Sequence, residues 1–226
     1  MINNQLKNPV WFALNETHKK YTINYDGLQF YDPNICPFGA FIDNNKTKNA
    51  LNKYAKLTDS FFLVSENETP LFDENIISLD KKIECCQMIL DTLIEVEITE
   101  EIILLSEKHI DQIYNLVWLV MPGYFRKRTF EMGKYFGVFK DNKLVSIAGQ
   151  RMQTNHFIEV SAVVTHPEYT RKGFSKQLTY HVTKDIIAQE KLPILHTNKG
   201  NIAIKMYENL GFKITRDMNW WHFTKK

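Results

Sequence analysis

The sequence predicts an α/β fold in which a mixed sheet is flanked by helices. Between residues 135 and 165, three strand-like segments are separated by short turns, which is typical of an antiparallel meander. A helical segment from Ser175 then leads to a short strand at 193–197, and a crossover of this kind places two strands parallel. The earlier part of the chain alternates short helices and strands, so we expect a smaller α/β half before the main sheet.

The elements of the first half follow from capping residues and apolar spacing. Asn8 and Pro9 predict the start of a helix from Val10 to about Lys20, because Pro fits the first helical turn. The acidic stretch at 95–101 changes the pattern, so we predict an α/β domain at 1–95 and a second domain at 96–226. The other elements expected before this boundary are a strand at 28–31, a loop through Pro33 and Pro37, a helix at 47–56, and strands at 61–64 and 86–90.

In the second half, capping and turn residues mark the ends of the expected elements more clearly. Ser106 predicts the cap of a helix that ends before Pro122, and Gly211 predicts the left-handed end of a helix at 202–210. A hairpin turn at 141–143 is expected between the first two strands. The strands expected in this half are 135–139, 144–152, 157–165, 193–197, 212–215 and 219–224.

A basic, glycine-containing turn at 171–175 lies between the strand 157–165 and the following helix. The first N–H groups of a helix have no helical partner and carry the positive end of its dipole, so a phosphate here would meet several donors. Turns of this composition are more often ordinary solvated connections. The turn therefore indicates an anion site only in combination with a second signal.

The second signal is the segment 194–201, followed by 203–212. The two segments together resemble the GNAT superfamily of N-acetyltransferases. In that family the motif Gln/Arg-x-x-Gly-x-Gly/Ala holds the pyrophosphate of coenzyme A, and an Asn followed by Tyr-x-x-x-Gly-Phe lines the thioester. The resemblance implies acetyl-CoA as co-substrate, with coenzyme contacts at Val163, Val164, Thr165, Thr170, Arg171, Lys172, Gly173, Phe174, Ser175 and Asn201.

The match to the family motifs has three departures. Thr170 stands where Gln or Arg is usual, and Ser175 replaces the second Gly or Ala. Main-chain N–H groups do most of the phosphate binding, so the turn should keep this role. One residue fewer than usual separates Asn201 from the tyrosine, which leaves Asn198 or Gly200 as alternatives for the family Asn.

Further motifs resemble a branch of the superfamily that carries an extra N-terminal half. The resemblance implies a GNAT fold preceded by an α/β half that covers or shapes the acceptor pocket. Exposed aromatics such as Trp11, Phe12 and Phe38 could instead bind a protein partner, although a hydrophobic interface between the two halves is favoured. The matching positions are 8–18, 37–38, 122–125, 128–129, Glu131-x-Gly133 and Ala148-Gly149-x-Arg151.

Acyl transfer from a thioester to an amine needs a neutral amine and a proton for the leaving thiolate. Glu159 lies four residues before Val163 on one strand, so both are expected on one face, and Glu159 is our first choice of general base. A structural strand carboxylate is the alternative. Tyr207 resembles the family tyrosine that hydrogen-bonds and can protonate the leaving sulfur, and a phenol with the usual pKa of about 10 carries the proton for this at neutral pH. Its alternative is a core aromatic.

Three more charged residues are candidates for the acceptor site. Glu131 is the reserve base or an anion for the amine, with a salt-bridge role favoured over either. Gln150 stands where the branch often has Glu, which could also move the base. Arg128 and Arg151 could hold a substrate carboxylate, although exposed arginines are usually solvated.

Composition excludes several other classes. With 28 Lys and Arg against 26 Asp and Glu, no charge excess favours nucleic acid or an anionic membrane. The N-terminus has no apolar signal core, so a cytoplasmic location is expected. The number and spacing of the cysteines, Cys36, Cys85 and Cys86, match neither a disulfide framework nor a metal site, so we expect buried free thiols. No Walker, Gly-x-Ser-x-Gly or His-Glu-x-x-His motif occurs, and we expect no metal.

The sequence thus predicts an acetyl-CoA-dependent N-acetyltransferase acting by direct attack in a ternary complex. A small-molecule amine is favoured as acceptor over a protein lysine, because the chain shows no charged track for a tail. A module that only binds or senses acyl-CoA is the competing class. Acyl length and the acceptor stay open, as does the choice between a monomer and a homodimer.

Overall fold

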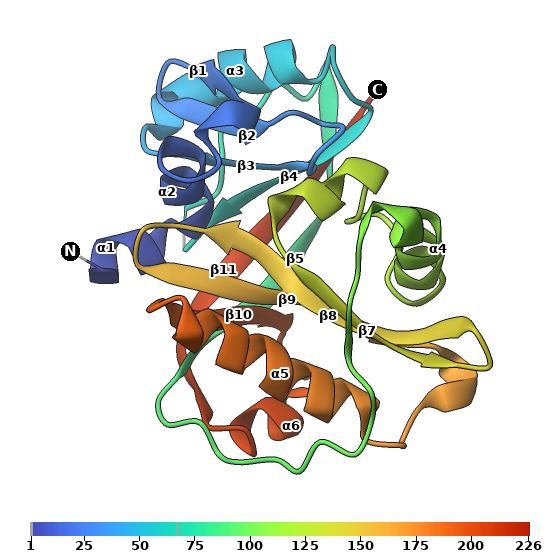
Figure 1. Cartoon of the computed structure of the whole chain (residues 1–226). Helices are drawn as coiled ribbons and strands as arrows, with labels where there is room; N and C mark the ends of the chain where they lie inside the picture. Colours follow the sequence, from blue (N-terminus) through green and yellow to red (C-terminus); the bar gives the residue numbers. More distant parts are fainter. Residues whose placement is uncertain (1, 67) are drawn as a thin grey trace.

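The fold is built on one eleven-stranded mixed sheet in the order β1-β2-β3-β4-β11-β5-β10-β9-β8-β7-β6 (Figure 1). The computed structural model describes residues 2–66 and 68–226. The strands are β1 Thr22–Tyr25, β2 Leu28–Tyr31, β3 Phe38–Phe41, β4 Ser60–Ser65, β5 Ile77–Leu90, β6 Ile103–Leu104, β7 Tyr135–Lys140, β8 Lys143–Gln153, β9 Phe157–Thr165, β10 Leu192–Asn198 and β11 Phe212–Lys225. The helices are α1 Ile2–Lys7, α2 Pro9–Asn15, α3 Thr47–Tyr54, α4 Ile110–Val120, α5 Phe174–Ala188 and α6 Ile204–Glu208. The α/β class and the mixed, helix-flanked sheet are confirmed.

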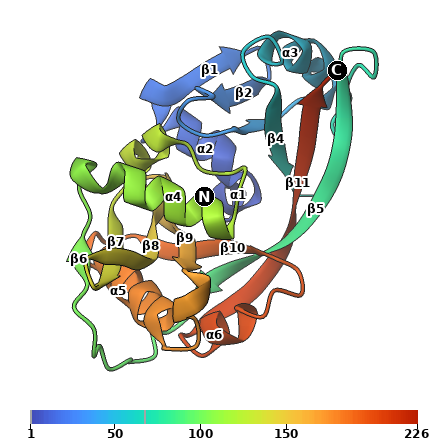
Figure 2. The same cartoon turned by 90° about the vertical axis from the view of Figure 1, so that its right-hand side faces the viewer.

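Two long strands, β5 and β11, join the two halves of the molecule. They pair antiparallel from Phe212 opposite Leu90 to Lys225 opposite Ile77, and Figure 2 shows them side by side through its whole height. The other edge of β11 pairs with β4, so the sheet is continuous across the boundary predicted at residue 95. Two separate functional domains therefore stay a prediction, and the halves share one hydrogen-bonded sheet.

Several predicted elements differ in extent from the observed ones. The helix at Pro9 ends at Asn15 instead of about Lys20. Asn8 is its N-cap residue, as expected, but makes no side-chain capping hydrogen bond, and its amide nitrogen donates to the Phe41 carbonyl. The two expected C-terminal strands are one strand, with a register irregularity between Ile214 and Arg216, just before the break expected at 216–218. The strand expected at 86–90 begins at Ile77, in a stretch whose many exposed polar residues hid it. Elements α1, β1, β3 and β6 are additional to those that the sequence predicts.

The second half follows the prediction closely. Asp141 and Asn142 have φ of 49° and 61° and form the tight turn between β7 and β8. Strand β10 pairs parallel with β9 through the crossover helix α5, as expected. Gly211 has φ of 98°, the left-handed conformation expected after α6.

Two features of β9 position the functional site. The parallel pairing of β9 with β10 covers only Phe157–Val160 and Leu192–Leu195, after which no register pairs are formed and the two strands part. On its other side, Gly149 pairs with Ser161 and Ile147 with Val164, so β9 has one extra residue there and forms a β-bulge. Ala162, in the bulge, has φ of 50°. The point at which β9 and β10 separate, which we call the fork, therefore lies directly beside the bulge in β9.

The core is divided among several clusters on the two faces of the sheet. One cluster packs α5, α6 and the strands β7–β10, and it includes Leu178, Ile186 and Cys86. Another includes Phe38, Trp220 and Cys85 and lies between the halves. The adjacent Cys85 and Cys86 point to opposite faces, and all three cysteines are buried free thiols, as predicted.

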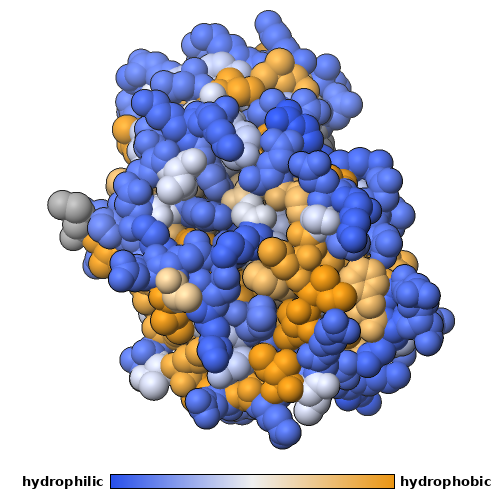
Figure 3. Space-filling model, in the orientation of Figure 1, coloured by the Kyte–Doolittle hydropathy of each residue, from blue (hydrophilic) through white to orange (hydrophobic). Residues whose placement is uncertain are grey.

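The outer surface is mainly hydrophilic. On the face in Figure 3, apolar side chains gather near the middle, at the level of β7, β8 and α5, inside a rim of hydrophilic residues. None of the helices in the described ranges has the length and apolar character needed to span a bilayer.

Candidate functional site

The fork between β9 and β10 opens into two adjoining cavities. One extends over the basic turn before α5, and the other reaches towards β5, β11 and the N-terminal half. Val163, Asn201 and Tyr207 line both cavities, which makes them one continuous cleft. We call the part over the basic turn the coenzyme end, and the part that reaches towards the N-terminal half the acceptor end.

The coenzyme end is formed by the turn at 170–175. Arg171 has φ of 62° and Gly173 has φ of 80°, and a turn with left-handed residues of this kind can gather backbone N–H groups on one side. Gly173 is the N-cap of α5, and an added Cβ would meet only the Gln177 amide at 3.7 Å. The requirement for glycine is therefore conformational, and the turn is an exposed cradle at the positive end of a fifteen-residue helix.

The hydroxyl groups around the turn are already engaged. The Thr165 hydroxyl lies 2.7 Å from those of both Ser175 and Ser146. The Thr170 hydroxyl donates to the Pro167 carbonyl at 3.1 Å. The backbone N–H groups and the exposed Arg171 and Lys172 are therefore the groups that the turn offers to an anion.

Nearly all residues predicted to contact the coenzyme line this cavity. The exception is Val164, which is 3% exposed and packs in the cluster on the side of α4. Its backbone still belongs to the strand segment at the fork. The predicted residues that line the cavity are Val163, Thr165, Thr170, Arg171, Lys172, Gly173, Phe174, Ser175 and Asn201.

The asparagines near the fork are held by local hydrogen bonds. Asn201 donates to the Thr197 hydroxyl at 2.9 Å and accepts from the Ala203 N–H at 2.9 Å, which supports the turn before α6. Asn198 accepts from the Cys85 thiol at 3.4 Å. Both line the acceptor end, so the assignment of the family Asn stays open between them.

Tyr207, on α6, is placed where the two ends meet. Its side chain belongs to the cluster under α5, and the residue is 7% exposed. Burial raises the pKa of its phenol to about 12, so the group is protonated at neutral pH. Both alternatives proposed for Tyr207 are thus compatible, because the ring packs in the core while the residue lines the cleft.

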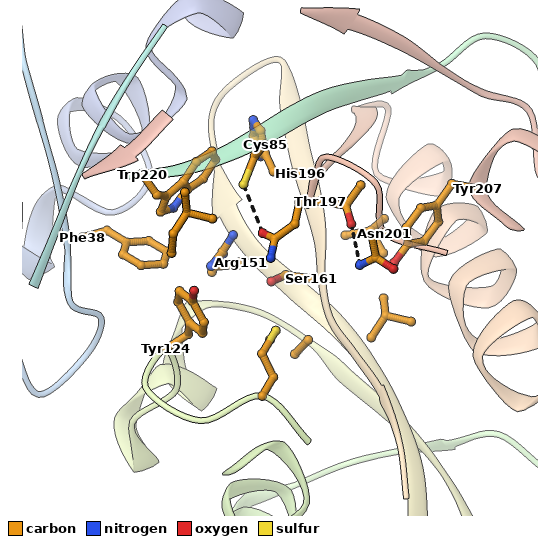
Figure 4. A pocket seen from close by; sticks show the side chains of 16 residues that line it. Phe38, Cys85, Tyr124, Arg151, Ser161, His196, Thr197, Asn201, Tyr207 and Trp220 are labelled. Atoms are coloured by element: carbon orange, nitrogen blue, oxygen red, sulfur yellow. Dashed lines mark hydrogen bonds between the residues drawn. The ribbon is translucent and has the colours of Figure 1, made fainter. Parts of the chain in front are cut away.

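The acceptor end includes several aromatic rings and draws on distant parts of the chain. Figure 4 shows Phe38, Tyr124 and Trp220 around Arg151, with Asn201 and Tyr207 at the opposite end of the cavity. Phe38 is on β3, Trp220 on β11, and Tyr124 in the segment after α4. The N-terminal half therefore contributes directly to this wall.

Arg151 is held rigidly among these rings. Its Nε and Nη2 donate to the two carboxylate oxygens of Glu159 at 2.7 and 2.8 Å, and its guanidinium lies 4.8 Å from the centre of the Phe38 ring. His196 Nδ1 lies 2.7 Å from Glu159 Oε1, and its Nε2 lies 3.0 Å from the Gln87 amide nitrogen. Because the Gln87 amide nitrogen can only donate, His196 Nε2 accepts there and Nδ1 donates to Glu159.

The geometry argues against Glu159 as the general base. Glu159 has no exposed surface, and Arg151 and His196 occupy its oxygens. Burial alone would raise its pKa, but the charge and hydrogen bonds of Arg151, with the hydrogen bond from His196, lower it to about 2. A carboxylate with such a pKa is a weak base at neutral pH.

The expected alignment of Glu159 with Val163 also fails. The β-bulge adds one residue between them, which reverses the alternation of side chains. Val163 packs with Val160 in the cluster under α5, on the face opposite to Glu159. Strand spacing alone could not show this, because the sequence does not announce the bulge.

The other charged candidates divide between the cavity and the surface. Arg128 and Glu131 form a salt bridge at 2.6 Å outside the acceptor cavity, and Arg128 lowers the pKa of Glu131 through this hydrogen bond. The favoured salt-bridge role of Glu131 therefore agrees with its contacts. Gln150 donates to Asp185 at 2.7 Å, which ties β8 to α5. Only Arg151 of this group lines the acceptor end.

Sequence reasoning gave no role at the acceptor end to several residues. Phe38 and Tyr124 lie in motifs shared with the extra-half branch, which was the available signal. Cys85, His196 and Trp220 lie on strands whose apolar pattern indicates burial but not a site. Among the described residues, no group of three or more His, Cys, Asp or Glu is placed to hold a metal ion.

Comparison with known proteins agrees with this arrangement. The model of the family described as FR47-like protein matches residues 135–221, which include the meander, the turn and the fork. A structure of a GNAT-family protein from Novosphingobium aromaticivorans shares 27% identity over 98% of each chain, with a TM-score of 0.85. The chain matches no curated protein sequence.

Two more solved structures share the fold at lower identity. A GCN5-related N-acetyltransferase from Kribbella flavida is 14% identical and covers 95% of this chain and 91% of its own, with a TM-score of 0.62. A GCN5-related N-acetyltransferase-like protein from Streptococcus suis is 10% identical and covers 96% and 93%, with a TM-score of 0.61. These two likenesses concern the fold. The family model and the structure from Novosphingobium aromaticivorans, together with the forked sheet and its basic turn, show that the chain belongs to the GNAT superfamily of acyltransferases.

Proposed function

We propose that the chain is an acetyl-CoA-dependent N-acetyltransferase that acts on the primary amine of a small molecule in a ternary complex. The observation that carries this proposal is the continuous cleft at the fork. It joins a basic turn rich in N–H groups to an aromatic cavity, and Tyr207 lines both parts.

The residues at the coenzyme end fit a molecule of coenzyme A. The turn at 170–175 offers backbone N–H groups and two exposed basic side chains to a pyrophosphate. Beyond Val160, the edge of β9 that faces β10 forms no register pairs, so Val163 and Thr165 can pair with an extended pantetheine arm as an added strand. When bound, acetyl-CoA supplies the thioester whose acyl group is transferred.

The open edge of β9 supports a position for the reacting carbonyl. Val163 lies beyond Val160, the last residue of β9 that pairs with β10, and it lines both parts of the cleft. The N–H of Val163 is therefore our candidate to polarise the carbonyl oxygen and to stabilise the charge that develops on it.

Tyr207 is our candidate for the group that protonates the leaving sulfur. In the balanced reaction one C–N bond forms, one C–S bond breaks, and one proton moves from nitrogen to sulfur. The raised pKa of Tyr207, about 12, keeps its hydroxyl protonated, so it can donate a hydrogen bond to the departing sulfur and pass its proton there as the proton from the nitrogen replaces it through solvent. The amine enters in its neutral form, and Glu159 holds Arg151 and His196 in place.

A second function remains in competition because of one observation. The buried and paired Glu159 leaves the acceptor end without a free carboxylate base among its lining residues. A module that binds acyl-CoA without turnover would have no need of one. Release of free thiol in the presence of an amine separates the two functions.

Calorimetric titration with acetyl-CoA and CoA, followed by a thiol-release assay with a panel of primary amines, tests the proposal. We expect micromolar binding and amine-dependent thiol release. Binding without release by any amine would favour the binding module. Absence of binding would contradict both functions.

A further inference from the structure

We propose that the acceptor carries a carboxylate as well as the reacting amine, and that Arg151 binds this carboxylate. The acceptor would then be a free amino acid and not a polyamine or a protein lysine. This inference rests on the proposed function, because it assigns the substrate class of the same cleft.

The first observation is the charge of the acceptor end. Among its described lining residues, Arg151 is the only Lys, Arg, Asp or Glu. A polyamine keeps at least one cationic group after acetylation, and such a group needs a carboxylate or an exposed polar wall. Here it would lie beside a guanidinium and aromatic rings. A molecule with its own negative charge matches this end better.

The second observation is that Arg151 is preorganised and retains an open donor group. Glu159 engages its Nε and Nη2, and Phe38 supports one face of the guanidinium. Its Nη1 has no hydrogen-bond partner within residues 2–66 and 68–226, and the side chain is 14% exposed on the cavity side. Arginine offers five N–H donors in a fixed plane, so it can serve a second carboxylate without releasing the first.

The third observation is the group behind Arg151. Glu159 Oε1 also accepts from His196, and Oε2 lies 3.4 Å from the Met152 N–H. The guanidinium therefore cannot rotate towards solvent when a ligand arrives. Ordering of this side chain has already occurred in the folded protein, so little entropy would be lost when a carboxylate binds.

The length of the acceptor is tested together with its charge. Arg151 and Val163 line the same cavity, so the acceptor has to reach from the guanidinium to the acyl carbonyl that we place at Val163. The panel of acceptors therefore needs α-amino acids together with β-alanine and longer ω-amino acids.

The test compares each amino acid with its carboxamide on the wild-type protein. The amide keeps the size and the amine but removes the charge. We expect kcat/KM for the best amino acid to exceed that for its amide about tenfold or more, as for loss of a charge-assisted hydrogen bond. Equal values, a preference for polyamines, or no turnover of any amino acid would overturn the inference.

Two variants assign the effect to Arg151. Arg151→Met alone would leave Glu159 buried without a partner, so the double variant Arg151→Met/Glu159→Gln is used. We expect it to bind CoA like the wild type and to lose the preference for the amino acid over the amide. Arg128→Met is the matched control, because Arg128 lies outside the cavity and should leave the preference intact. An unchanged preference in the double variant would also overturn the inference.

The failures are distinguishable. If CoA does not bind to the wild type, the proposed function fails and the inference fails with it. If CoA binds and amines without a carboxylate are acetylated with the same kcat/KM as amino acids, the proposed function stands and only the assignment of Arg151 is lost.

Discussion

The two ends of the cleft are built in different ways. The coenzyme end comes mainly from 163–176 and 201–207, and it presents exposed backbone and flexible basic side chains. The acceptor end combines buried side chains from β3, β5, β8 and β11 with the segment after α4. The first can be changed without disturbing the core, whereas at the second a change in the site is also a change in stability.

The largest effect is expected at the buried ion pair. Glu159→Gln would leave Arg151 charged and unpaired, so we expect a loss of about 3–5 kcal/mol in the free energy of unfolding. Glu131→Gln makes the same chemical change at the exposed pair with Arg128 and should cost far less. Urea denaturation measures both. Unchanged stability with a hundredfold fall in turnover would return Glu159 to the role of base.

The next effect is a pH dependence of the free energy of unfolding, caused by the buried residue His18. His18 is buried and contacts Tyr31 and Met132. Burial lowers its pKa to about 4, and the charge of Lys20 acts in the same direction, whereas the hydrogen bond to the Met132 carbonyl acts against both. The unfolded chain binds a proton below pH 6.5 that the folded chain does not, so stability is lost as the pH falls from 6.5 to 4. The loss is at most roughly 3 kcal/mol.

Denaturation midpoints between pH 7 and 5 measure this slope above the range in which Glu159 titrates. His18→Gln should flatten it, because Gln does not titrate. A slope that persists in the variant would show that another group carries it.

A smaller effect, confined to binding, is expected at the coenzyme end. Gly173→Asp places a negative charge in the phosphate cradle, and we expect affinity for CoA to fall about a hundredfold, roughly 2.7 kcal/mol. Gly173→Asn is the matched control, since Asn has the same shape, tolerates positive φ and has no charge. Calorimetry should find most of the affinity retained in the control. Equal losses in both variants would point to the backbone instead of the charge.

The smallest effect is expected where the two ends meet. Tyr207→Phe keeps the packed ring and removes the proton donor, so we expect kcat to fall about tenfold with CoA binding unchanged. The loss is modest because a thiolate leaves fairly easily without an acid. Stopped-time thiol assays across pH 6 to 9 measure it. An unaltered kcat would leave Tyr207 with only its packing role.

The contrast between the coenzyme end, built from residues close in the chain, and the acceptor end, built from distant ones, explains what the sequence could predict. The crossover helix, the Gly173 turn and the Gly211 stop depend on residues close together in the chain, and the structure agrees with each. Their physical causes, capping and left-handed φ, act within a few residues. A local pattern was therefore sufficient for the fold of the second half and for the coenzyme-end lining.

Long-range features could not be predicted in this way. The bulge at Ala162 reverses the side-chain alternation along β9, and no residue type there requires it. The salt bridge between Arg151 and Glu159 depends on the register of β8 against β9, and the position of Phe38 depends on β3 joining the sheet. These contacts arise from tertiary packing, which spacing along one strand does not contain.

The pairing of β4 with β11 has a consequence for how the chain reaches its native state. Phe62 on β4 lies opposite His222, so the N-terminal strands cannot complete their sheet until residues 212–225 have been synthesised. Until then the edge of β4 and its apolar side chains lack their final partner, which is a known hazard for aggregation. Pairing over such a sequence separation also raises the contact order, so we expect slow folding that begins in the local meander β7–β9 and finishes when β11 docks.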